Sequence, residues 1–350
     1  MTESRKYRIS TLLILFLLLL TGTAGGYAAQ TYESGFLQKQ TEVSTETAGS
    51  GTVLLGGMPV GIYMETDGVM ILNTEQVRGI DGREYEPASD VVRSGDYITA
   101  VDHKKISGKK ELLEAVAAID GDKVILTVRR GEEDVDVRIE PVEYAPGAYR
   151  LGIWVRDNVQ GLGTVTFLTE QSKFGALGHG IHDTDTNGLM DISGGTVYRT
   201  SIQDIIRGTN GSPGSMEGII VYNNYNVLGS IDKNTEAGIY GTIDRIDELF
   251  EEQISIATAK KEEIETGPAT IRCYIDNEIK EYEIQVTEID MSGTEINKGL
   301  VIKVTDSELL EKTGGIIQGM SGSPIIQNGK LIGGVTHVFV QDSTMGYGIF

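Results

Sequence analysis

Ser321 stands in the stretch "IIQGMSGSPII", with Gly319 two residues before it and Gly322 directly after it. A serine hydroxyl is a weak nucleophile at neutral pH, so it needs a general base and hydrogen-bond donors for the oxyanion. Flanking glycines let the backbone turn sharply and point successive N–H groups into one pocket. The spacing predicts Ser321 as a nucleophile, with the N–H groups of Gly319 and Ser321 as the oxyanion hole. An ordinary Gly-Ser turn is the alternative, since "NGSPGS" at 210–215 has the same residue types.

A base for this serine must come from one of four histidines, at positions 103, 179, 182 and 337. His103 lies in a polar turn. His337 lies in the apolar stretch "GGVTHVFV", where a histidine packed in the core is expected. His179 in "ALGHG" has a glycine on each side, which leaves its ring little competition for space. We therefore predict His179 as the general base, with His182 as its rival.

The order of these residues bears on the fold. An α/β-hydrolase elbow needs Gly-x-Ser-x-Gly and a histidine late in the chain, but position 323 is Ser323 and only His337 follows. A base that precedes the serine is the chymotrypsin-like order. From Tyr144 to Phe350 short apolar stretches alternate with glycine turns, which predicts an all-β sandwich or a pair of barrels. Helices are expected only in "SIQDIIR", "TIDRIDELFEEQ" and "DSELLEK". The closing "GYGIF" has the pattern of a strand still in progress.

Residues 53–143 have another pattern. "SGKKELLEAVAAIDG" predicts an amphipathic helix, because Leu112, Val116 and Ile119 fall on one face and Ser107 can cap it. "KVILTVRRGEEDVDVRIEPV" alternates with period two on both sides of a turn, which predicts a β-hairpin.

Together with "GDYI" at 95–98, these elements resemble a PDZ domain. The resemblance implies an α+β fold, in which a small barrel-like sheet with helices binds an extended peptide by strand addition. It places the peptide-binding segment at Gly57, Val60, Gly61 and Ile62.

The first 29 residues predict an export signal. A basic start, the apolar run "TLLILFLLLL" and the small residues before Gln30 form the three parts of a signal peptide. The segment is either cleaved after Ala28 or Ala29 or kept as a membrane anchor, and the polar residues 30–52 read as a linker. Both outcomes place the rest of the chain outside the cytoplasm.

Composition narrows the classes of function. The formal charge of −21 disfavours nucleic-acid binding, because such a surface repels phosphate backbones. The single cysteine, Cys273, excludes an intramolecular disulfide and a cysteine metal cluster. "DTDTNGLMDISG" begins like a calcium loop at Asp183, but its twelfth position is Gly194 where a bidentate glutamate is required. We predict a turn-rich loop, no metal and no cofactor.

"FGALGHGI" followed by "GGIIQGMSGSPII" is similar to the stage IV sporulation protein B peptidases, over essentially the whole chain. The resemblance implies a membrane segment, a PDZ domain (53–143) and a chymotrypsin-like double β-barrel peptidase domain (144–350), so the fold class is mainly β. The family's catalytic histidine and serine fall on His179 and Ser321. Its proposed acid falls on Asp306, in "VTDSELLEKTGG".

Asp306 has a second possible role, as a helix cap. Thr305 and Glu308 form a capping-box pattern, so Asp306 also suits the start of a short helix. Asp183, Asp185 and Asp204 compete for the role of the acid, and a His–Ser dyad without an acid is a further alternative.

The resemblance implies an exported serine endopeptidase of sporulation signalling. It would act in the space between the two membranes of the forespore, cleave its own chain, and then cleave a membrane-bound regulator to trigger sigma-K activation. The expected partners are a protein substrate at a membrane, the chain itself and a peptide ligand of the PDZ domain. A non-catalytic, PDZ-bearing docking protein is the alternative from another class. A general quality-control protease is less favoured, because the PDZ domain precedes the catalytic domain here.

Overall fold

The computed structural model describes residues 51–209, 211–250 and 252–350. The expected export signal and nearly all of the linker lie outside the described residues. None of the helices in the described ranges is both long enough and apolar enough to cross a membrane.

Six antiparallel strands close a first barrel, in which each strand pairs with the next and the last pairs with the first. In ring order they are β11 (Ile153–Leu168), β2 (Pro59–Thr74), β13 (Ile192–Tyr198), β16 (Val227–Thr235), β17 (Gly238–Ile243) and β12 (Lys173–Ala176). Only parts of β2 and β11 belong to the ring. The interior holds fully buried side chains such as Val60, Ile62 and Phe174, so the barrel is a packed core.

A second ring of six antiparallel strands closes in the C-terminal part of the chain. In ring order they are β19 (Gly267–Ile275), β20 (Glu278–Ile289), β21 (Leu300–Val304), β24 (Asp342–Ile349), β23 (Lys330–Phe339) and β22 (Pro324–Gln327). Their alternating apolar residues fill a second core. Cys273 lies in this core with no exposed surface, and burial raises the pKa of its thiol far above the ordinary range.

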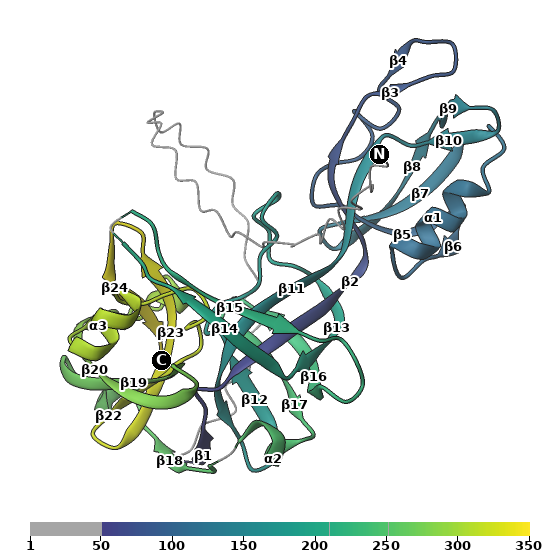
Figure 1. Cartoon of the computed structure of the whole chain (residues 1–350). Coiled ribbons are helices and arrows are strands. Elements are labelled where there is room, and N and C mark those ends of the chain that lie inside the picture. Colours follow the sequence, from purple (N-terminus) through teal and green to yellow (C-terminus); the bar gives the residue numbers. More distant parts are fainter. Residues whose placement is uncertain (1–50, 210, 251) are drawn as a thin grey trace, which may run out of the picture. The chain divides into compact units, whose positions relative to one another are not determined.

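Shorter elements connect and flank the rings (Figure 1). They are β1 (Thr52–Leu55), β14 (Thr200–Ile206), β15 (Ser215–Ile220), β18 (Ser255–Thr258), α2 (Ile246–Leu249), α3 (Ser307–Thr313) and the 3-10 turns η1 (Lys261–Glu263) and η2 (Ile296–Lys298). β1 pairs with β11 of the first ring and with β18, and β18 pairs with β23 of the second ring, so these two strands tie the rings together.

The expected helix in "SIQDIIR" is instead the strand β14, paired antiparallel with β15. Its isoleucines have helical spacing, but they are β-branched and pack equally well on a strand, so the pairing partner decides. Of the other expected helices, "DSELLEK" forms α3, and "TIDRIDELFEEQ" forms only the short α2.

The PDZ part has its own core, built from β2, β5 (Tyr97–Val101), β7 (Val124–Arg130), β8 (Glu133–Ile139) and α1 (Lys109–Ala117). Smaller pieces are β3 (Val77–Arg78), β4 (Glu84–Tyr85), β6 (Lys104–Lys105), β9 (Val142–Ala145) and β10 (Ala148–Arg150). The expected hairpin is β7–β8, in register from Val124 opposite Ile139. The cap of α1 is Gly108 rather than Ser107, whose N–H and hydroxyl donate to Glu111 instead.

β2 and β11 are shared between the PDZ core and the first barrel. They pair antiparallel along nearly their whole length, from Ile153 opposite Thr74 to Thr164 opposite Pro59 (Figure 1). One end of this two-stranded ribbon packs into the PDZ core and the other into the first barrel. Part of the expected range 53–143 therefore packs in the first barrel, and part of the expected range 144–350 packs against the PDZ core.

Candidate active site

The loop of Ser321 is fixed by strand β11 of the first barrel. Thr164, which is buried, donates its N–H to the carbonyl of Ser321 at 3.0 Å and its hydroxyl to the carbonyl of Gly319 at 2.8 Å. Gly322 lies so close to β11 that a Cβ atom there would overlap the carbonyl oxygen of Thr164 and the backbone nitrogen of Leu177. Two segments that are far apart in sequence thus meet backbone to backbone, and only glycine fits at 322.

The expected oxyanion hole keeps its donors available. Gly319 has φ +101°, the conformation for which glycine is favoured, and this turns the backbone ahead of Ser321. No hydrogen bond between described residues uses the N–H of Gly319 or of Ser321. The neighbouring N–H of Gly322, by contrast, donates to Val335 at 2.7 Å. The two predicted donors therefore remain free for a ligand oxygen.

The Ser321 hydroxyl is hydrogen-bonded in this structure. Its Oγ donates to the carbonyl of Thr336 at 2.8 Å, and the Thr336 hydroxyl donates in turn to Asn297 at 2.6 Å. Thr336 lies on β23, at a register shift between Val335 and Val338. Because strand pairing is interrupted there, the Thr336 carbonyl can accept from the serine.

His179 lies close to this serine loop. It follows β12 in a loop where Leu177 and Gly178 have φ +70° and +69°. A Cβ atom on Gly178 would lie 2.9 Å from the Thr336 methyl group. The ring centroids of His179 and His337 are 4.7 Å apart. Residues 177–179, 319–322 and 335–337 therefore converge on one place, which joins the two barrels.

A backbone carbonyl orients the His179 ring. Nδ1 of His179 lies 2.9 Å from the carbonyl oxygen of Gly180. A carbonyl can only accept, so the hydrogen is on Nδ1, and Nε2 of the neutral ring carries the lone pair that a general base needs. Burial lowers the pKa of His179, the hydrogen bond to Gly180 raises it, and the neighbouring His182 lowers it. Burial is the largest of these effects, so the base is neutral at pH 7.

The other histidines have different surroundings. His337 has a buried Nδ1 without a partner among the described residues, and burial next to His179 lowers its pKa to about 4. His182 pairs with Glu236, Nε2 to Oε2 at 3.3 Å. His103 faces Asp136 at 3.7 Å in an exposed turn of the PDZ part.

Asp306 is the N-cap of α3. One of its carboxylate oxygens accepts from the N–H of Leu309 at 3.0 Å, and the other accepts from the N–H of Glu283 at 3.3 Å. No hydrogen bond or ion pair of the described residues joins Asp306 to His179. The capping role is therefore visible in the structure, whereas the role as triad acid stays a prediction.

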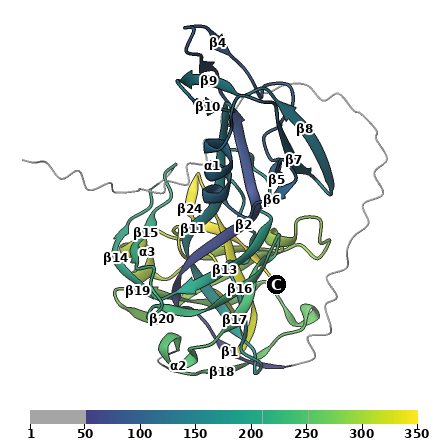
Figure 2. The same ribbon diagram turned by 90° about the vertical axis from the view of Figure 1, so that its right-hand side faces the viewer.

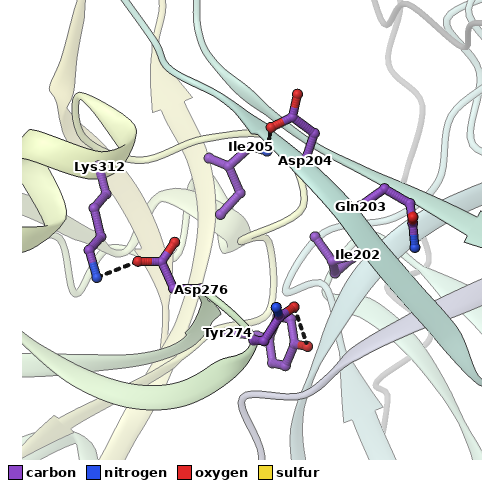
Figure 3. A pocket seen from close by; sticks show the side chains of 8 residues that line it. Ile202, Gln203, Asp204, Ile205, Tyr274, Asp276 and Lys312 are labelled. Atoms are coloured by element: carbon purple, nitrogen blue, oxygen red, sulfur yellow. Dashed lines mark hydrogen bonds and ion pairs between the residues drawn. The ribbon is translucent and has the colours of Figure 1, made fainter.

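The competing aspartates are engaged elsewhere. Asp183 is buried and paired with Arg156, which also binds Asp185 at 3.0 Å. The guanidinium thus occupies the carboxylates that a cation would need in this loop. Asp204 lines an open pocket of about 280 Å³, and its carboxylate accepts from the N–H of Ile205 (Figure 3). The other residues of that pocket are Ile202, Gln203, Ile205, Tyr274, Asp276, Asn277 and Lys312, which include none of the predicted catalytic residues.

The expected peptide-binding segment of the PDZ domain lies in the wall of the first barrel. Gly61 and Ile62 pair with β11 on one side and with β13 on the other. Val60 and Ile62 are buried in the barrel core, and the N–H of Gly57 donates to Val165. Because Gly61 and Ile62 are paired on both sides and Gly57 and Val60 are bound to β11, the segment forms barrel wall rather than an open edge for a peptide.

The strand beside helix α1 is the first part of β11. The N–H of Lys109 at the start of α1 donates to Asp157 at 2.8 Å. Beyond the C-terminal end of α1, a Cβ atom on Gly121 would lie 2.9 Å from the hydroxyl of Tyr149 on β10. Residues 153–156 pair with β2 on one edge, and no strand of the described residues pairs with the other. Figure 2 shows α1 beside β10 and β11.

The fold and the site define a class of protein, a PDZ-bearing serine peptidase with chymotrypsin-like double barrels. Comparison with family models agrees. The SpoIVB peptidase S55 family matches residues 147–350, and the PDZ domain family matches residues 56–140. Because the first match covers more than half of the chain, the protein belongs to the SpoIVB peptidase S55 family.

Among solved structures, one match is the crystal structure of the PDZ domain of an SdrC-like protein from Listeria monocytogenes, whose sequence is 24% identical to the matched part of this chain. That match covers 25% of this chain and 87% of the other, with a TM-score of 0.20. No curated protein matches the sequence.

Sequence reasoning missed several residues that build the site. Thr164 and Thr336 hold the serine loop through hydrogen bonds that depend on strand register. Neither lies in a motif with a distinctive spacing, so no local signal marks them.

The capping geometry predicts how Asp306 variants behave. Asp306→Asn keeps an acceptor for the Leu309 N–H, so we expect the rate at which a fluorophosphonate labels Ser321 to stay within about threefold of wild type. Asp306→Ala loses the cap and should lower the free energy of unfolding by about 1 kcal/mol. Labelling kinetics and denaturant unfolding measure the two effects. If Asp306→Asn slows labelling about a thousandfold or more while folded, Asp306 is the triad acid after all.

The lowered pKa of His179 predicts the pH dependence of labelling. A base with a depressed pKa stays neutral to lower pH, so the rate should fall only as pH drops below the ordinary histidine value of about 6.5. Measuring the labelling rate between pH 4 and pH 9 locates this midpoint. A midpoint at or above 6.5 would contradict the assignment of the base or of its surroundings.

Proposed function

We propose that the protein is an exported serine endopeptidase in which Ser321 is the nucleophile and His179 the general base. One observation supports this proposal above the others. The serine, two free N–H groups and a histidine with its lone pair on Nε2 meet where the two barrels join. A docking module has no need of this convergence.

The proposed reaction follows from these positions. Rotation about the Cα–Cβ bond of Ser321 releases Oγ from Thr336 and brings it to His179, a change that apo structures often require. Nε2 of His179 takes the hydroxyl proton as Oγ bonds to the substrate carbonyl carbon, and the N–H groups of Gly319 and Ser321 bind the oxyanion. The imidazolium then protonates the leaving amine and the C–N bond breaks. Water, deprotonated by His179, hydrolyses the acyl-enzyme.

The biological setting is proposed from the family and from the sequence. Export would be directed by residues 1–29, and the peptidase would act in the forespore intermembrane space, anchored or free. It would first cleave its own chain and then a membrane-bound regulator, which leads to sigma-K activation. Family membership and the PDZ–peptidase order support this setting.

We also propose that the PDZ part binds an extended peptide, at the free edge of residues 153–157 rather than at residues 57–62. Leu151 is buried and Gly152 has φ +66°, so a tight turn leads into this edge. α1 lies alongside it, as a strand-addition site of this domain type requires. The bound segment would be part of a substrate or of this chain.

The first test is self-cleavage. The full chain in detergent and its Ser321→Ala variant are incubated for hours and followed by intact mass. We expect fragments, and covalent labelling by a fluorophosphonate, from the wild type alone. Ser323→Ala is a matched control, because this buried neighbouring hydroxyl has no partner among the described residues and should be dispensable. If folded wild-type protein neither cleaves nor labels, the docking-protein alternative takes the place of the peptidase.

Hydrogen exchange tests the peptide-binding edge. Decapeptides that tile residues 30–52 are arrayed, and the tightest binder is added to the full-length Ser321→Ala variant. We expect slowed exchange at residues 151–157 and 109–119, because strand addition satisfies free backbone groups. Slowed exchange at residues 57–62 instead would place binding in the segment that the sequence predicted. If none of the peptides binds, residues 30–52 are not the bound segment.

A further inference from the structure

The loop that carries His179 has an unusual backbone. Leu177 has φ +70° and Gly178 follows with φ +69°. Left-handed backbone is uncommon for a bulky residue and persists only where the surroundings hold it. The structure must therefore contain groups that keep this loop in place.

Asn234, near the end of β16, makes three hydrogen bonds to the loop. Its Oδ1 accepts from the N–H of Ile181 at 2.9 Å. Its Nδ2 donates to the carbonyl of Ile181 at 2.9 Å and to that of Met190 at 3.0 Å. A side-chain amide offers two donors and an acceptor, and all of these functions are used here. These three hydrogen bonds tie the loop, at Ile181 and at Met190, to the tip of the β16–β17 hairpin.

The rest of the hairpin tip packs against the same point. The N–H of Gly180 donates to the carbonyl of Glu236 at 3.2 Å. A Cβ atom on Gly180 would lie 2.6 Å from the carbonyl oxygen of Thr235, so only glycine allows this approach.

One peptide plane links Asn234 to the catalytic base. The Gly180 carbonyl and the Ile181 N–H belong to the same planar unit and point in opposite directions. Asn234 fixes the N–H end of that unit, and the carbonyl end accepts from Nδ1 of His179. Hydrogen bonds on both sides of a peptide unit also polarise one another.

We infer that Asn234 is a positioning residue of the peptidase: through the Gly180–Ile181 peptide unit, it holds the carbonyl that sets the tautomer and direction of His179. The peptide carbonyl thus takes the orienting part that a carboxylate plays in a catalytic triad. The inference rests on the proposed function.

The test compares Asn234→Ala and Asn234→Asp with wild type as full chains. Ser321 is labelled with a fluorophosphonate across pH 4 to 9, and melting temperatures show that each variant is folded. Asn226→Ala is the matched control, because the Asn226 amide also donates to a backbone carbonyl, that of Val221, but does not touch the His179 loop. The control should label at the wild-type rate.

We expect Asn234→Ala to slow labelling by about ten- to a hundredfold, since small misplacements of a catalytic group cost this much. The weakened bond between His179 and Gly180 should also move the acid midpoint to lower pH, because that bond raises the pKa. Asn234→Asp keeps one acceptor and adds a negative charge, so its midpoint should move to higher pH. His182, His337 and Glu236, the other titratable groups around His179, are unchanged in both variants.

The outcomes separate the two proposals. A wild type that does not label refutes the peptidase function itself. If the wild type labels, and the folded Asn234→Ala variant labels at the same rate and with the same acid midpoint, only the role of Asn234 is overturned. If Asn234→Ala does not fold, Asn234→Asp decides, and an unshifted midpoint in that variant overturns the inference.

Discussion

The site depends on a backbone-to-backbone contact between the two barrels. Gly322 lies against Thr164 and Leu177 with no room for a Cβ atom, and Thr164 adds two hydrogen bonds to the carbonyls on either side of Met320. A side chain at 322 would separate the strands and move Ser321 away from the loop of His179. The free N–H groups of Gly319 and Ser321 belong to the neighbouring peptide units, whose carbonyls on Gln318 and Met320 accept from the N–H groups of Met216 and Ser323. The orientation of the two proposed oxyanion donors is therefore fixed by β15 and by the serine turn itself, beside the contact between the barrels.

The β2–β11 ribbon links this site to the PDZ part without a flexible linker. β11 begins beside α1, continues into the first barrel, carries Thr164, and turns into β12 just before His179. A peptide added to the free edge at residues 153–157 would pair with the same strand that holds the serine loop. The proposed peptide-binding edge and the proposed active site therefore share one strand.

Local chemistry explains what the sequence could predict. Ser321 and His179 could be proposed as nucleophile and base because these roles need particular residue types with glycines directly beside them. The hairpin β7–β8 could be predicted because its alternation is strict. The position of residues 57–62 in the barrel wall could not be predicted, since an alternating strand has the same sequence pattern beside a helix as in a barrel wall. Strand partners are chosen by non-local packing. The same holds for β14, whose isoleucines fit both a helix period and a strand, and for Asn234, which acts on residues some fifty positions earlier.

The structure also separates two tasks that a triad acid normally combines. One is to fix the tautomer of the histidine, and the Gly180 carbonyl does this. The other is to stabilise the imidazolium, for which a full negative charge is better than a peptide dipole. In the described arrangement both oxygens of Asp306 accept hydrogen bonds at the start of α3. Because α3 leads through Gly314 and Gly315 directly into the Ser321 loop, this cap stabilises the segment that presents Ser321. An effect of Asp306 on activity can thus arise through the serine rather than through the histidine.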